Sequence, residues 1–116
     1  MERDLGVDAH VRAGNRLFYL AWLVVGIAFG AEAIIATMNG RALRTALPST
    51  LHGALGLVGL GLLTLLWLSG RRAHEMKEAA QPFAAEQRRH GRASDFILAL
   101  AGLHAFLGFL DLLQRL

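Results

Sequence analysis

The segment Leu17–Met38, LFYLAWLVVGIAFGAEAIIATM, indicates the architecture of the chain, because it is apolar over a length that can cross a membrane. Two further runs have the same character: about Pro48–Ser69 (PSTLHGALGLVGLGLLTLLWLS) and about Phe96–Leu113 (FILALAGLHAFLGFLDLL). A helix needs about 20 apolar residues to cross a bilayer, and backbone groups in lipid must be hydrogen-bonded within the segment. The sequence therefore predicts an all-α bundle of three transmembrane helices, which forms a single integral membrane domain over residues 1–116.

Composition excludes several classes of protein. The chain has 116 residues, of which 54% are hydrophobic, and it contains no cysteine. A disulfide framework, a thiolate nucleophile and an iron–sulfur cluster all require cysteine. The chain is too short for a large enzyme with its own substrate domain, and it carries no recognisable catalytic motif. The basic residues flank apolar runs and form no aromatic-rich basic patch, so we expect no nucleic-acid partner. We therefore expect at most a non-catalytic subunit of a larger complex.

The distribution of lysine and arginine predicts the orientation in the membrane. Most of these residues lie in the N-terminal segment and in residues 70–94, whereas the first loop holds Arg41 and Arg44 and the C-terminus holds Arg115. The positive-inside rule then predicts a cytoplasmic N-terminus and a periplasmic C-terminus. We therefore expect a multi-pass protein of a bacterial inner membrane.

The cytoplasmic segment 70–94 has a helical pattern of its own. Two helical stretches, RRAHEMKEAAQ and PFAAEQRRHGR, are divided by Pro82. Proline is tolerated in a first helical turn and rarely in a helix interior. We expect helices two and three to extend into the cytoplasm and to turn near Gln81 and Pro82. Ser94 could cap a fresh helix start after Gly91.

Four ionisable residues fall within the predicted spans: Glu32, His52, His104 and Asp111. Such residues are costly in a membrane, so each one is a candidate functional residue. All four lie in the outer or middle part of the predicted bundle. Glu32 and Asp111, together with His52, could form a proton relay or an ion site, which is the pattern of a small transporter acting as an oligomer. The alternative is a set of structural polar contacts between helices.

The two membrane histidines share one local motif. Residues 51–56 read LHGALG and residues 103–108 read LHAFLG, so each histidine is followed four positions later by glycine. Positions i and i+4 share a helix face, and the glycines Gly56 and Gly108 would leave flat space beside an imidazole. A tetrapyrrole bound between helices needs such space together with a neutral imidazole nitrogen for its metal.

This motif resembles the haem-binding helices of small b-type cytochromes. The third span, ILALAGLHAFLGFLDLL, is similar to the haem-bearing helix of succinate dehydrogenase membrane anchors and of the cytochrome b561 type. The resemblance implies haem b with His104 as axial ligand and His52 as a candidate second ligand. It also implies electron transfer in a respiratory complex, quinone chemistry and partner subunits. A chlorin pigment, which takes one axial histidine, is an alternative cofactor.

Counting along the spans from their outer ends separates His52 and His104 by roughly 12 Å in depth. That expectation disfavours one haem held by both histidines within a single copy of the chain. A cofactor-free scaffold subunit is therefore the second hypothesis. It rests on close-packing glycines such as Gly26 and Gly30, which predict seams with other membrane subunits or with a second copy.

The turn holds a further histidine and carboxylate pattern. His74 and Glu78, like Glu86 and His90, are spaced by four residues. Folding at Pro82 would bring the two pairs opposite each other, where they could hold a divalent metal. Solvated charge on helix extensions explains the same pattern.

Overall fold

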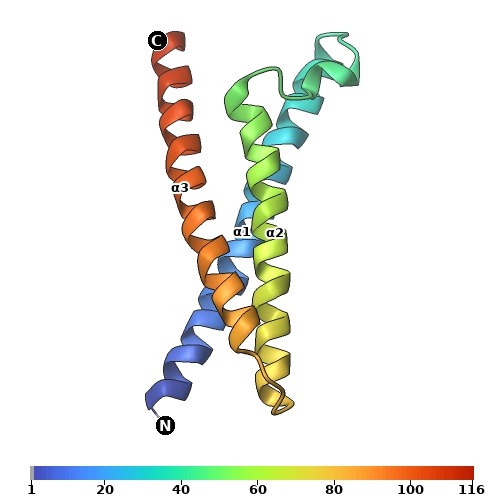
Figure 1. Ribbon diagram of the computed structural model, residues 1–116. Coiled ribbons are helices and arrows are strands. Elements are labelled where there is room, and N and C mark those ends of the chain that lie inside the picture. Colours follow the sequence, from blue (N-terminus) through green and yellow to red (C-terminus); the bar gives the residue numbers. More distant parts are fainter. Residues whose placement is uncertain (1) are drawn as a thin grey trace.

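The computed structural model describes residues 2–116, including the side chains of residues 6–114 and of Leu116. Its elements are α1 (Glu2–Met38), the 3-10 helix η1 (Leu43–Ala46), α2 (Leu51–Glu78) and α3 (Ala84–Arg115). The predicted all-helical architecture with three long apolar helices is confirmed (Figure 1). The side chains of Arg3 and Arg115, two cations used to predict orientation, lie outside the described residues.

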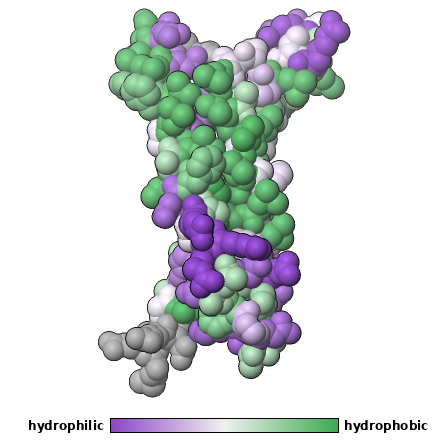
Figure 2. Space-filling model, in the orientation of Figure 1, coloured by the Kyte–Doolittle hydropathy of each residue, from purple (hydrophilic) through white to green (hydrophobic). Residues whose placement is uncertain are grey.

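The molecule is an elongated bundle measuring 57 × 25 × 22 Å. The N-terminus and the α2–α3 turn lie together at one end, here called the hairpin end (Figure 1). The α1–α2 connection and the C-terminus lie at the opposite end, here called the loop end. An apolar band covers the middle and much of the loop end, whereas the hairpin end is mostly hydrophilic (Figure 2). The hairpin end therefore carries the helix extensions predicted for residues 70–94.

Very little of the apolar surface is covered by protein. Among the described residues only Ala36, at 1% exposure, and Leu60, at 7%, are buried. Large side chains such as Leu20, Ile27 and Leu98 stay more than half exposed. A water-soluble domain could not leave so much apolar surface uncovered. Lipid takes the place of a protein core, as expected for a multi-pass membrane protein.

The turn between α2 and α3 forms a tight helix cap. The backbone N–H of Gln81 donates to Met76 O at 2.9 Å, and that of Ala80 donates to Lys77 O at 3.1 Å. Ala80 adopts a left-handed conformation with φ of 54°. These are the two hydrogen bonds of a Schellman cap, and Pro82 follows directly. The predicted turn near Gln81 and Pro82 is confirmed.

The fresh helix start predicted at Ser94 is wrong, because α3 runs without interruption from Ala84 to Arg115. Glycine in a helix interior costs only about 0.5–1 kcal/mol. A break after Gly91 would instead leave backbone groups of two helix ends without partners. The continuous helix is the better solution, and it places His90 and His104 on one rigid element.

Two tryptophans of neighbouring helices join α1 to α2. Trp67 of α2 donates its indole N–H to Asn15 Oδ1 at 2.7 Å and stacks on Phe18, with ring centres 4.2 Å apart. Trp22 of α1 donates to Thr64 Oγ1 at 3.2 Å. The main helix interface is α2 with α3, and the described parts of α1 and α3 have no backbone contact. Both α1 and α3 therefore pack on α2.

Candidate functional site

The two membrane histidines meet between α2 and α3. The imidazoles of His52 and His104 stack face to face, with ring centres 4.0 Å apart and planes inclined by 11°. His52 Nδ1 donates a hydrogen bond to the backbone carbonyl of His104 at 3.1 Å. The predicted depth difference of roughly 12 Å is therefore wrong.

The physical reason is that the two helices do not end at the same level. His52 lies in the first turn of α2, whereas α3 continues for three turns beyond His104 (Figure 1). Counting residues from span ends assumes that the ends are level, and α3 extends past the start of α2. Contact between the imidazoles depends on this stagger.

The glycine of each motif receives the histidine of the other helix. A Cβ on Gly108 would lie 2.6 Å from Cε1 of His52, and a Cβ on Gly56 would lie 3.1 Å from Cε1 of His104. The two LHxxxG segments therefore form a reciprocal pair of sockets. The space beside Gly56 and Gly108, which the motif predicts for a macrocycle, is filled by the imidazoles of His104 and His52.

This arrangement does not fit a haem held between His52 and His104. Axial imidazoles bind one iron from opposite faces of a macrocycle, whereas these two rings are in direct stacking contact. The flat spaces beside Gly56 and Gly108 are also filled. In this packing the pair acts as a helix–helix contact.

Glu32 and Asp111, the two carboxylates predicted to join these histidines, differ in solvent exposure. Glu32 is exposed on α1, while Asp111 is half-buried on α3. The described backbones of α1 and α3 are not in contact. The structure therefore joins His52 to His104 but does not gather Glu32 into the same cluster.

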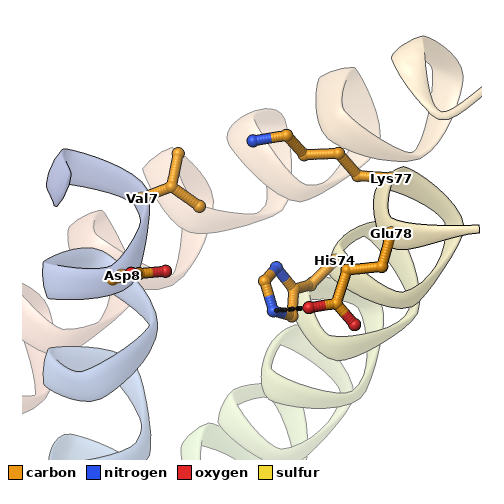
Figure 3. A pocket seen from close by; sticks show the side chains of 5 residues that line it. All are labelled: Val7, Asp8, His74, Lys77 and Glu78. Atoms are coloured by element: carbon orange, nitrogen blue, oxygen red, sulfur yellow. Dashed lines mark ion pairs between the residues drawn. The ribbon is translucent and has the colours of Figure 1, made fainter. Parts of the chain in front are cut away.

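The four residues of the turn pattern separate into different contacts. His74 Nε2 pairs with Glu78 Oε1 at 3.3 Å, and Asp8 of α1 faces this pair across a pocket of about 250 Å³ (Figure 3). Glu86 pairs with Arg89 at 3.5 Å. No group of three metal-ligating side chains occurs among the described residues. A bare divalent metal therefore lacks a ligand set in the turn.

A second pocket, larger than the first, is an open cleft of about 1080 Å³ at the hairpin end, lined by residues of all three long helices. Its volume reaches the upper end of the usual range for ligand pockets, about 300–1,000 Å³. Apolar side chains, among them Leu17, Leu63 and Leu66, line the part nearest the membrane band. Arg71 stands at the cleft with its guanidinium carbon 5.0 Å from the ring centre of Trp67. The cleft thus combines apolar walls with a cationic side chain.

Two histidines face each other across this cleft. His10 of α1 and His90 of α3 have ring centres 6.1 Å apart and planes inclined by 89°, and both line the cavity. Metal–imidazole bonds are about 2.0–2.1 Å long, so two imidazoles on opposite sides of one metal ion have ring centres about 6 Å apart. The observed separation is close to that value, and it also lies within the range of an ordinary edge-to-face ring contact.

His10 does not stand out in the sequence, because it lies in a charged segment before the first apolar run. One signal was present: His10 is followed by Gly14 at the same spacing as in the two membrane motifs. No atom lies within 4 Å of the Cβ position of Gly14. The glycine therefore leaves open space on the helix face that carries His10.

Comparisons of the chain with protein-family models, with curated proteins and with solved structures found no match.

Proposed function

We propose that this protein is a small integral membrane subunit that binds a tetrapyrrole, a b-type haem, and serves one-electron transfer in a membrane complex. The observation that carries the proposal is the facing pair of His10 and His90 in the hairpin-end cleft. This site takes the place of the His52 and His104 site suggested by the sequence motif.

The number of ligands favours a metal that arrives with a macrocycle. Two imidazoles are too few to hold a bare metal ion, and the described residues offer no third ligand. A tetrapyrrole supplies the remaining four nitrogen ligands itself, so His10 and His90 would complete the coordination from α1 and α3. The cleft that both helices line is the place where a flat group would enter.

The lining of the cleft supports an amphipathic, acidic ligand. Leu63 and Leu66 offer apolar contact to a ring system, and the Gly14 face is open. Arg71 offers a cation to peripheral carboxylates and is itself more than half exposed in its ion pair with Glu75. A haem has this division between an apolar macrocycle and acidic side chains.

Axial ligation by two histidines favours electron transfer over substrate chemistry. A haem held by His10 and His90 would supply reversible one-electron transfer at a potential set by its ligands and surroundings. The chain's own contribution would be to hold the group between His10 and His90. Reductant and oxidant must then come from partner subunits or from a quinone.

The proposed setting is a bacterial inner membrane with the hairpin end in the cytoplasm. The excess of lysine and arginine in the N-terminal segment and in residues 70–94 supports this orientation. The redox partner would then approach from the cytoplasmic side.

The test is a hemin titration of the chain purified in mild detergent without cofactor. We expect one haem per chain, a red-shifted Soret band and a sharp reduced α-band. His10→Ala and His90→Ala should each weaken binding at least tenfold and remove the low-spin spectrum. His104→Ala is the matched control, because it removes a histidine from a different helix contact. This variant should keep the wild-type hemin affinity and the low-spin spectrum. Circular dichroism verifies that each variant remains helical.

Two results would overturn the assignment. A wild-type chain that binds no hemin above the level of empty micelles contradicts tetrapyrrole binding. Loss of the spectrum in His104→Ala, with retention in His90→Ala, would return the cofactor to the membrane histidines.

The second candidate function is a cofactor-free scaffold subunit. It is favoured by the open surface of Gly26 and Gly30, which have no atom within 4 Å of their Cβ positions. Small residues on an uncovered helix face allow another transmembrane helix to approach closely. Under this function Gly26→Leu abolishes co-purification of partner chains, and the wild type stays colourless with full haem supply.

A further inference from the structure

Ser69 lies beside His90 in a way that determines which ring nitrogen carries a proton. The Ser69 hydroxyl lies 2.8 Å from the backbone carbonyl of Leu66 and 3.1 Å from His90 Nδ1. A hydroxyl has one proton to donate. The carbonyl can only accept, so the hydroxyl proton goes to Leu66 O, and Ser69 Oγ is left to accept from His90.

The consequence is a fixed tautomer. His90 Nδ1 must carry hydrogen to donate to Ser69 Oγ, so in the neutral ring Nε2 keeps the lone pair. A metal binds the imidazole nitrogen that has the lone pair, and the hydrogen bond made by the other nitrogen sets ring orientation and basicity. Ser69 lies on α2 and His90 on α3, so the α2–α3 interface itself prepares the ligand.

The neighbouring residue makes room for the ring. A Cβ on Gly70 would lie 2.9 Å from Cε1 and 3.3 Å from Nδ1 of His90. Any other side chain at this position would displace the imidazole from Ser69. The Ser69 hydroxyl and the space at Gly70 together hold the His90 ring in one orientation.

We propose that Ser69 is a positioning residue for His90: it holds the imidazole as the Nδ1–H tautomer, with Nε2 available to a metal in the cleft. This inference rests on the proposed function for the metal's identity, but the tautomer itself is a property of the chain alone. Removing the hydroxyl should release the ring to exchange between tautomers.

The experiment measures tautomers by long-range ¹⁵N–¹H NMR on cofactor-free protein in micelles at about pH 8, well above the usual histidine pKa of about 6.5. We expect His90 to show a protonated Nδ1 and an unprotonated Nε2. Ser69→Ala should shift a large fraction of His90 to the Nε2–H form, and Ser69→Thr, which retains a hydroxyl, should restore the wild-type signal. Ser49→Ala is the control, because Ser49 lies outside the cleft, and it should leave the His90 signal unchanged.

The second readout is hemin affinity. Loss of an outer hydrogen-bond partner to a metal ligand typically costs 10–100-fold in affinity. We expect a loss of about tenfold in Ser69→Ala, with recovery in Ser69→Thr. A wild-type His90 protonated on Nε2, or an unchanged tautomer in Ser69→Ala, overturns the inference. A wild type with the expected tautomer that binds no hemin contradicts the proposed function instead, so the two failures are distinguishable.

Discussion

The contact between His52 and His104 predicts opposite effects on stability for alanine substitutions at two glycines of α3, Gly108 and Gly102. Gly108→Ala places a methyl group 2.6 Å from the His52 ring, whereas Gly102 has open space at its Cβ position. Overpacking costs about 1–3 kcal/mol, and an uncrowded Gly→Ala change in a helix gains about 0.5–1 kcal/mol. We expect Gly108→Ala to lower, and Gly102→Ala to raise, the free energy of unfolding measured in mixed micelles.

A double mutant identifies the cause of that loss. In a His52→Ala background the ring is gone, so Gly108→Ala should no longer destabilise the protein and should behave like Gly102→Ala. An undiminished loss in this background would show that the crowding involves atoms other than the His52 imidazole.

At the scale of elements, the ends of α1 and α2 differ in one informative way. Both helices end in the same cap, but α1 has Gly40 at the left-handed position, with φ of 65°, and α2 has Ala80, with φ of 54°. A left-handed conformation costs a residue with a Cβ about 1–2 kcal/mol. The α2–α3 turn therefore carries strain that the end of α1 avoids.

Ala80→Gly should relieve that strain. Glycine also increases the entropy of the unfolded chain, which offsets part of the gain, so we expect a net rise of up to about 1 kcal/mol in the free energy of unfolding. Ala79→Gly, one residue earlier at φ of −79°, has no strain to relieve and should destabilise by about 0.5–1 kcal/mol. Equal effects of the two substitutions in a denaturant titration would argue against a left-handed Ala80.

Elements were easier to predict from the sequence than their registry. Long apolar runs and Pro82 define three helices and a turn, since both signals act locally. The stagger that brings His52 to His104 depends on how far α3 extends past α2, which no local pattern records. The cleft was missed for a related reason: His10 and His90 lie 80 positions apart in sequence, and only the packing of α1 and α3 around α2 brings them together.

At the scale of the whole molecule, the orientation can be tested directly, because the chain has no cysteine of its own. Gln81→Cys places one thiol in the α2–α3 turn, and Thr45→Cys places one in η1. With the hairpin end in the cytoplasm, a membrane-impermeant maleimide added to intact cells labels Thr45→Cys alone. After the membrane is permeabilised, the maleimide labels both cysteine variants. Labelling of Gln81→Cys in intact cells would reverse the proposed orientation.

The indole contacts that join α1 to α2 also impose an order on biosynthesis. Asn15 and Trp22 bond to residues that are synthesised later, 52 and 42 positions further along the chain respectively. At a synthesis rate of about 5–20 residues per second, Trp67 follows Asn15 after roughly 3–10 s. During that interval α1 lacks the helix on which it packs, whereas α2 and α3 are separated by one short turn. The contacts between α1 and α2 therefore form only after a long stretch of further synthesis, while α3 can pack on α2 as soon as it has been made.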